Sequence, residues 1–212
     1  MNLILASASP RRQALLQTLG VPFTSRPADI DEQPRPEESA ERYVTRMSRE
    51  KAAAVFATLP SQPDTWVLGS DTSVVIDGDV LGKPVGFDHA AAMLTRLSGR
   101  THQVLTAVAL QGPCCTDVEL VTTEVEFTAL TQRDINLYWR SGEPADKAGA
   151  YGIQGLGGRF VRRIDGDYYA VMGLPLERTA AMLVTAGFNL WQQLLHDLPN
   201  QGQSQSSKEG SA

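Results

Sequence analysis

Short apolar runs of strand length alternate with longer segments at helical spacing along this chain, and the alternation restricts it to folds that mix strands and helices. Residues 2–6 are mostly apolar and of the length of a short buried strand. Pro10 then stands where helices begin, and leucines recur at helical spacing up to Gly20. Two long strand-like runs, residues 102–110 and 118–130, follow each other around a Gly-Pro turn. The sequence therefore predicts an α/β fold with long antiparallel strands at its centre.

Three further segments carry turn or loop signals. Residues 22–38 contain four prolines and are expected to form a loop. Asp71 stands between two apolar runs in "VLGSDTSVV", which predicts one strand, a polar break and a second strand. The segment "RFVRRIDGDYYAVMG", residues 159–173, is expected to form a hairpin through residues 165–167.

The composition excludes several classes of protein. With 42% hydrophobic residues the chain can bury a sizeable core, and we expect one domain over residues 1–198 before a disordered polar tail over residues 199–212. A net charge of −5 argues against a nucleic-acid partner. No apolar stretch approaches the roughly 20 residues that span a bilayer, and the N-terminal charges follow the apolar run, unlike those of a signal peptide. We therefore expect a cytoplasmic protein with no nucleic-acid and no membrane partner.

Residues that bind soft metals are too few for a zinc site. The two cysteines, Cys114 and Cys115, are adjacent and form no CxxC pair, and the three histidines stand far apart in the sequence. A bound metal would therefore be held by carboxylates, which favours Mg²⁺ or Mn²⁺.

Two adjacent arginines fall in the first turn of the first predicted helix. The positive end of the helix dipole lies there and disfavours cations. One arginine would be consistent with a solvated helix face. Two together, Arg11 and Arg12, indicate that an anion binds nearby.

A mixture of lysines and carboxylates recurs in polar segments along the chain. These residues are Glu32, Lys51, Asp71, Lys83 and Lys147. Phosphoryl chemistry needs such a mixture, because cations neutralise phosphate oxygens while carboxylates hold a metal or orient a water. Each lysine alone is equally consistent with a solvated surface position. Asp71 is open to two interpretations, a turn aspartate or a carboxylate aimed from a strand end into a cleft.

The segment "GAYGIQGLGGRF", residues 149–160, is rich in glycine but lacks the context of a dinucleotide-binding loop. Such a loop needs a following helix, whereas the strand-like "RFVRRI" follows here. The glycines instead indicate close approach of the backbone to something flat or crowded. Gln154 can both donate and accept hydrogen bonds, which suits the edge of a base. The alternative is an exposed glutamine in a tight loop.

Seven short motifs occur in series between roughly residues 3 and 186: "LASASPRR", "EKA", "GSDT", "GKP", "LSGRTHQVLTAV", "DKAGAYGIQG" and "GLPL". In this order they resemble the Maf family of nucleoside triphosphate pyrophosphatases. The resemblance implies a fold similar to that of the inosine triphosphate pyrophosphatases, a mixed twisted sheet flanked by helices with a substrate cleft between two lobes. It also implies a homodimeric hydrolase that uses a divalent metal and cleaves a nucleoside triphosphate between the α and β phosphates.

The resemblance assigns roles to individual residues. Asp71 matches the proton acceptor of the family, and Ser9 and Arg12 match its phosphate-binding pair. Its other polar cleft residues match Glu32, Lys51 and Lys83. Mg²⁺ or Mn²⁺ would lie between Glu32, Asp71 and phosphate oxygens, and the sequence leaves open which carboxylate holds the metal and which accepts the proton.

Three positions distinguish subgroups of the family. Arg11, Thr72 and Gln154 match the dTTP/UTP pyrophosphatase subgroup, whereas the 7-methyl-GTP subgroup has Trp, Gln and Glu there. An arginine and a neutral amide suit the carbonyl-rich edge of uracil or thymine, so we expect hydrolysis of dTTP, UTP and modified pyrimidine nucleotides as a house-cleaning activity. Two alternatives stay open: a pyrophosphatase for a modified purine such as 7-methyl-GTP, and a nucleotide-binding regulator of septum formation without turnover.

Overall fold

A computed structural model describes residues 1–60 and 64–191 of the chain. The end of the expected domain at residue 198 and the expected tail over residues 199–212 therefore lie outside the described residues. Within the described part, no helix combines the length and the apolar character needed to cross a bilayer.

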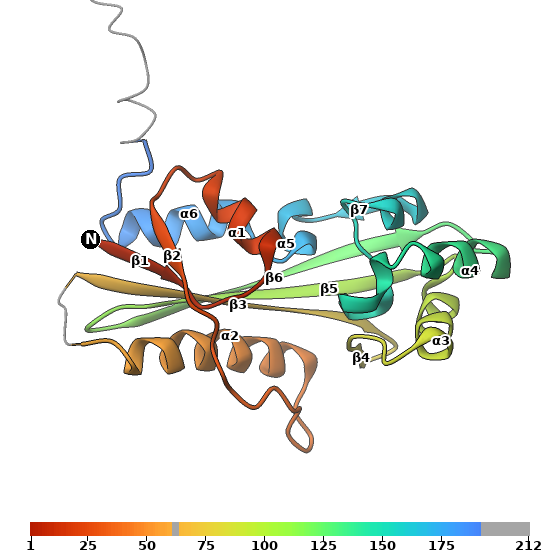
Figure 1. The fold of residues 1–212 in the computed structure, drawn as a ribbon, viewed down its shortest axis with the longest axis horizontal. Helices are drawn as coiled ribbons and strands as arrows, with labels where there is room; N and C mark the ends of the chain where they lie inside the picture. The colour runs from red at the N-terminus through yellow and green to blue at the C-terminus, as the bar shows by residue number, and fades with distance from the viewer. Residues whose placement is uncertain (61–63, 192–212) are drawn as a thin grey trace, which may run out of the picture.

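A sheet of seven strands runs through the molecule (Figure 1). In chain order the strands are β1 (Asn2–Leu5), β2 (Phe23–Ser25), β3 (Thr65–Ile76), β4 (Asp79–Leu81), β5 (Thr101–Gln111), β6 (Thr116–Phe127) and β7 (Val161–Asp165). The order across the sheet is β2-β1-β3-β5-β6-β7, and β4 pairs with one end of β3. β1 runs parallel to β2 and β3, whereas the other pairs are antiparallel. This mixed sheet confirms the predicted α/β fold and its long antiparallel centre.

Helices cover both faces of the sheet. They are α1 (Pro10–Gln17), α2 (Ala40–Ala57), α3 (Phe87–Leu97), α4 (Gln132–Arg140), α5 (Tyr168–Met172) and α6 (Leu176–Thr185), with the 3₁₀ helices η1 (Glu143–Asp146), η2 (Ala148–Ala150) and η3 (Leu156–Phe160). Figure 1 shows α2 on one side of the central strands and α1, α5 and α6 on the other, with α3 and α4 gathered at one end of the long strands.

The apolar core beside α1 and α6 is separated from the core beside α3 and α4. Leu68 of β3 packs into the first cluster, and Val74 of the same strand packs into the second. Strand alternation turns Ser70 and Thr72 of β3 to the same face between them, together with Thr106 of β5. These three hydroxyl residues, called the polar waist below, lie between the two apolar clusters.

Asp71 does not interrupt the strand, contrary to the prediction of a polar break. β3 pairs with β5 continuously through this position, and Asp71 lies opposite Ala107. The strand continues because Lys51 from α2 pairs with the carboxylate, so the charge does not have to leave the sheet. β3 ends in a turn with positive φ angles at Asp77 and Gly78, which suit a two-residue hairpin loop.

The predicted hairpin through residues 165–167 is wrong in its second half. The first strand of the hairpin forms as β7, which pairs with β6, but the residues that follow it form the short helix α5. Asp167 accepts hydrogen bonds from the N–H groups of Tyr169 and Ala170 and thereby caps this helix. Gly173, at a φ of 116°, ends it in the left-handed region.

The proline-rich segment over residues 22–38 contains a short strand that the sequence analysis did not predict. β2 pairs in parallel with β1 over three positions. A strand of this length carries no periodic signal of its own, and its pairing with β1 is what defines it. The chain beyond β2 then leads Glu32 to α2, where it contacts Lys51.

Candidate active site

The middle of β3 has one open edge. β1 pairs with residues 65–68 and β4 with residues 74–76, and no described strand pairs with residues 69–73 on that side. β5 pairs with the opposite side of β3 along this whole stretch. The carboxyl end of β1 thus opens onto an unpaired strand edge, and crevices of this kind at the ends of parallel strands commonly bind ligands.

Asp71, Lys51 and Glu32 form a linked group of charges on the α2 side of this edge. Nζ of Lys51 lies 2.7 Å from Oδ1 of Asp71 and 3.0 Å from Oε1 of Glu32. Asp71 and Lys51 are each 8% exposed, whereas the Glu32 side chain is 54% exposed. Removing one member of a buried ion pair costs stability, because it leaves the other charge less compensated. Three residues that the family resemblance assigned to one site are therefore in contact.

Gly69 explains how Lys51 reaches β3. A Cβ atom at Gly69 would lie 2.2 Å from the carbonyl oxygen of Ser48 and 2.8 Å from the amide nitrogen of Ala52. The backbone of α2 therefore touches the strand in the turn that carries Lys51. The sequence analysis did not select Gly69, although a glycine inside a strand-like run is the usual signal for such an approach.

Arg12 is anchored on the opposite face of the sheet. Ser9 caps α1 by accepting a hydrogen bond from the Arg12 N–H at 3.4 Å. The guanidinium donates through Nε to the Gly173 carbonyl at 2.9 Å and through Nη2 to Oγ1 of Thr72 at 3.2 Å. Burial lowers the pKa of Arg12, and the nearby charge of Asp71 acts in the opposite direction. The predicted phosphate-binding pair thus adjoins a residue predicted to select the base.

The polar waist holds the end of α5 against the sheet. Ser70 donates to the Gly173 carbonyl at 2.9 Å, and Thr106 donates to the Ala170 carbonyl at 2.7 Å. The Oγ1 atoms of Thr72 and Thr106 are 3.0 Å apart. The sequence analysis selected Thr72 from this group but not Ser70 or Thr106, because their shared partners come from a distant part of the chain.

Asp146 connects Arg11 to the segment that carries Lys147. Nη1 of Arg11 lies 3.9 Å from Oδ2 of Asp146, whose Oδ1 lies 2.6 Å from Nζ of Lys147. Lys147 also donates to the Glu143 carbonyl at 2.7 Å. Arg11 and Lys147 are therefore joined across α1 and η1 by one exposed carboxylate.

In the part of the chain that the structure describes, Lys83 and Gln154 make no ion pair or hydrogen bond with the charged group of Asp71, Lys51 and Glu32. Both are exposed, and neither makes a hydrogen bond or ion pair with any other described residue. Lys83 follows β4, next to Gly82, whose carbonyl accepts a hydrogen bond from the Gly149 N–H at 3.1 Å. Gln154 lies in the turn before η3. The structure places both beside the glycine-rich segment instead of in the charged group.

Glu32 and Asp71 are the predicted metal ligands, and their chemistry fits a metal shared with a substrate. No group of three or more His, Cys, Asp or Glu side chains among the described residues could hold a metal by itself. The two carboxylates nevertheless contact one cation, the Lys51 ammonium. Mg²⁺ is commonly bound by one or two carboxylates together with substrate phosphates. A metal here would take its remaining ligands from phosphate oxygens and water.

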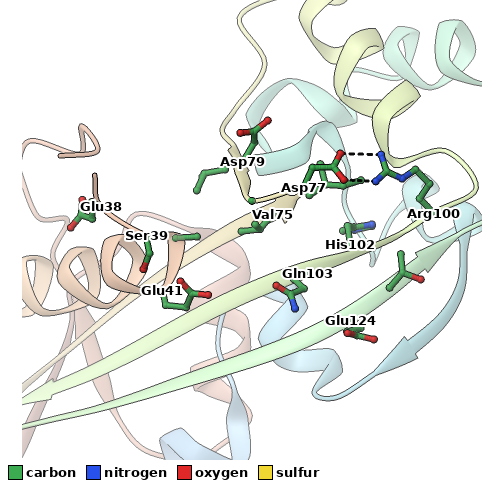
Figure 2. A pocket seen from close by; sticks show the side chains of 15 residues that line it. Glu38, Ser39, Glu41, Val75, Asp77, Asp79, Arg100, His102, Gln103 and Glu124 are labelled. Carbon is green, nitrogen blue, oxygen red and sulfur yellow. Dashed lines mark hydrogen bonds and ion pairs between the residues drawn. The ribbon is translucent and has the colours of Figure 1, made fainter. Parts of the chain in front are cut away.

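A hollow of about 690 Å³ lies outside this group of residues (Figure 2). The start of α2, the β3–β4 turn, β5 and β6 line it, and none of the predicted site residues belongs to its lining. Its carboxylates come from Glu38, Glu41, Asp77, Asp79 and Glu124. Arg100 is bound to Asp77 by the hydrogen bonds drawn in Figure 2. This excess of negative charge would repel a polyphosphate, so the hollow is not the predicted phosphate site.

Comparison with known proteins agrees with the series of motifs. The family profile described as "Maf-like protein" matches residues 2–186. The chain is 52% identical over 190 residues to a dTTP/UTP pyrophosphatase of Hahella chejuensis, which covers 90% of this chain and 94% of that protein. It is 56% identical over 182 residues to a dTTP/UTP pyrophosphatase of Shigella sonnei, which covers 86% of this chain and 91% of that protein.

Two solved structures are more distant. The Ham1 protein of Staphylococcus aureus is 15% identical, with a TM-score of 0.44 over 60% of this chain and 72% of that one. A nucleoside-triphosphatase, or dITP/XTP pyrophosphatase, of Mycobacterium abscessus is 16% identical, with a TM-score of 0.40 over 95% of this chain and 100% of that one.

Proposed function

The chain belongs to the Maf family, and from that premise we propose that it is a nucleoside triphosphate pyrophosphatase that hydrolyses dTTP and UTP. It cleaves between the α and β phosphates and releases the nucleoside monophosphate and pyrophosphate. Modified pyrimidine nucleotides that share the same base edge are further substrates. The activity removes such nucleotides from the pool.

The ion pair of Asp71 and Lys51 at the open edge of β3 carries this proposal. A buried ion pair contributes little net stability, so its place in the middle of a strand indicates a chemical role. Lys51 occupies Oδ1 of Asp71, and Oδ2 has no hydrogen-bond partner among the described residues. We assign Oδ2 as the atom that accepts the proton of the attacking water.

Cationic side chains on both faces of this edge would bind the triphosphate. Lys51 adjoins Asp71, and Arg12 is held in place by Thr72 and the Gly173 carbonyl. Such preorganised cations offset the negative charge that develops on the phosphates during cleavage. Lys83 would add a further cation to the phosphates from the side of β4.

Glu32 and Asp71 would hold the divalent metal, Mg²⁺ or Mn²⁺. The bound metal supplies neutralisation of phosphate charge and polarisation of the scissile bond. Lys51 keeps the two carboxylates close together, since it contacts both of them. Chelation with EDTA is expected to abolish pyrophosphate release, and addition of Mg²⁺ or Mn²⁺ is expected to restore it.

Arg11, Thr72 and Gln154 would select the base. Gln154 can donate to a carbonyl of uracil or thymine and accept from the adjacent N–H. The Thr72 hydroxyl makes hydrogen bonds with Arg12 and Thr106. We therefore assign Thr72 the role of fixing the first turn of α1, which carries Arg11 and Arg12. Arg11 would exchange its long contact with Asp146 for a carbonyl of the base.

A panel of nucleoside triphosphates assayed for pyrophosphate in the presence of Mg²⁺ or Mn²⁺ tests the proposal. We expect dTTP and UTP to give the highest kcat/KM. Preference for 7-methyl-GTP would instead support a purine pyrophosphatase. Nucleotide binding without pyrophosphate release would support a regulator of septum formation. The relatives named dTTP/UTP pyrophosphatase favour neither alternative.

We further propose that the protein works as a homodimer in the cytoplasm. The family resemblance supports the homodimer, and the cytoplasmic location follows the expectation from the sequence. Light scattering coupled to size-exclusion chromatography tests the dimer, and a mass close to the 23.0 kDa of one chain would contradict it.

A further inference from the structure

Two glycines of the segment that carries Gln154, Gly155 and Gly157, pack against one carboxylate and one phenol. A Cβ atom at Gly155 would lie 2.2 Å from Oε2 of Glu143. A Cβ atom at Gly157 would lie 2.5 Å from the hydroxyl oxygen of Tyr138. At Gly155 and Gly157, the close approach that the glycines indicated in the sequence is therefore an approach to Glu143 and Tyr138.

Hydrogen bonds from the same two side chains hold the loop backbone on both sides of Gln154. Glu143 accepts from the N–H of Leu156 at 2.7 Å and from the N–H of Gly157 at 3.0 Å. Tyr138 accepts from the N–H of Gly152 at 3.0 Å and donates to Oε1 of Glu143 at 2.7 Å. Residues 152–157 are thus held at three backbone positions by one connected pair of side chains.

The charge of Glu143 is matched to these donors. Partial burial by itself would raise the pKa of Glu143, but the hydrogen bonds from Tyr138, Gly157 and Leu156 lower it below its ordinary value. Burial is the largest cause that raises the pKa of Tyr138, so its phenol keeps its proton to donate. The carboxylate and the phenol therefore have opposite hydrogen-bonding roles, and neither can be exchanged without losing a partner.

The side chain of Gln154 contrasts with this held backbone. It is exposed and has no hydrogen-bond partner among the described residues, so only the backbone determines where its amide can point. An amide that must donate and accept at once tolerates little displacement, because both hydrogen bonds depend on angle and distance.

We propose that Glu143 is a positioning residue that holds the Gln154 loop for recognition of the uracil or thymine edge. Tyr138 supports it by fixing Oε1 and the Gly152 end of the loop. This inference rests on the proposed function, because it assigns Glu143 a part in base selection at that site. Glu143 itself contacts the loop backbone and not the base, so it acts only by positioning Gln154.

The test compares UTP with CTP, whose base edge carries an amino group where uracil has a carbonyl. In Glu143→Gln, an NH₂ group replaces one carboxylate oxygen. That oxygen accepts a hydrogen bond from a loop N–H or from the Tyr138 hydroxyl, and the NH₂ group cannot accept it. We expect this substitution to lower the UTP-to-CTP ratio of kcat/KM by about 10-fold, as expected when one buried polar group loses its partner. Glu177→Gln, a matched change at an exposed position of α6, is expected to leave the ratio unchanged.

A double-mutant cycle with Gln154→Ala separates positioning from a general structural role. Gln154→Ala is expected to lower the same ratio, and Glu143→Gln is expected to change it no further in that background. A structural defect would instead lower kcat/KM for UTP and for CTP in parallel. In the Gln154→Ala background it would lower both values further. Tyr138→Phe provides a second folded variant with the ring retained, and we expect it to lower the ratio in the same direction.

The outcomes are distinct for the two proposals. Wild-type protein that releases no pyrophosphate from UTP contradicts the proposed function. Active wild-type protein with an unchanged UTP-to-CTP ratio in both Glu143→Gln and Tyr138→Phe overturns the positioning role. An unchanged ratio in Gln154→Ala overturns it as well, because the loop would then not contact the base.

Discussion

At the scale of single residues, the notable feature is a carboxylate inside a buried strand. Asp71 keeps full backbone pairing with β5 while its side chain contacts an ammonium 2.7 Å away. Leucine or valine at this position would stabilise the strand without the free energy that is needed to remove an ion pair from water. The fold therefore does not explain the charge, which agrees with the role proposed for Asp71 in the reaction.

We expect Asp71→Asn to abolish turnover of UTP and to leave the fold intact. An amide cannot accept the proton of water at neutral pH, and loss of a general base typically lowers kcat by about 10²–10⁴-fold. Pyrophosphate release measures the loss, and circular dichroism checks the fold. Asp117→Asn, at an exposed position of β6, is the matched control. Near wild-type kcat in Asp71→Asn would show that another group accepts the proton.

We expect three residues to determine the base preference, so that substituting them changes the preferred nucleotide. Arg11→Trp, Thr72→Gln and Gln154→Glu together supply a stacking face and an acceptor pair for a cationic purine, so the triple variant should gain activity on 7-methyl-GTP. Gln154→Glu alone should lower kcat/KM for UTP by about 10- to 100-fold, the equivalent of roughly 1–3 kcal/mol for mismatched polar groups. If the UTP to 7-methyl-GTP ratio of the triple variant equals that of the wild type, these residues do not select the base.

At the scale of elements, the site depends on how closely α2 lies against β3. The strand has no Cβ at Gly69, and the helix backbone fills that space at Ser48. Lys51 is carried by the same turn, so the contact sets the distance between its ammonium and the sheet. A helix displaced outward would separate the ammonium from Asp71 and would also release Glu32.

Gly69→Ala is therefore expected to lower both stability and activity. The added methyl group meets backbone atoms that cannot rotate away, and overpacking of this kind typically costs about 1–3 kcal/mol. Urea unfolding measures the loss of stability, with Gly82→Ala as a control, because a Cβ there has no atom within 4 Å. If the two variants have the same urea concentration at the midpoint of unfolding, α2 can move to accommodate the methyl group without loss of stability.

At the scale of the whole molecule, one buried histidine links stability to pH. His102 is 2% exposed, its Nε2 lies 2.8 Å from the Tyr151 hydroxyl, and its ring packs edge-on against Phe127. Burial lowers its pKa to about 4 from an ordinary value of 6.5. The unfolded chain therefore binds a proton at a higher pH than the folded protein does.

We expect the free energy of unfolding to fall as the pH drops from about 6.5 to about 4. The contribution of neutral His102 is complete above the unfolded-state pKa and is lost progressively below it, by roughly 3 kcal/mol in total. Urea unfolding at pH 7 and pH 5 measures the slope. His102→Gln should lose this part of the pH dependence, whereas His89→Gln, at an exposed position, should retain it. The same slope in both variants would assign the effect to other groups.

The sequence by itself determined the features that depend on neighbouring residues. The helix that begins at Pro10 and the long β5–β6 pair form as predicted, because turns and periodicity act within a few residues. The motif series likewise identified the family and the residues of the charged group.

Tertiary structure alone decided the features that depend on residues far apart in the chain. β3 continues through Asp71 because Lys51, 20 residues earlier, pairs with it. β2 exists because β1 pairs with it. The N–H of Asp167 donates to Oγ1 of Thr123 in β6, and this contact fixes the start of a helix where a second hairpin strand was expected. The crowding around Gly155 comes from Glu143, not from a base. In each case a local pattern allowed more than one conformation, and contacts between distant segments selected one of them by pairing a charge or a backbone group.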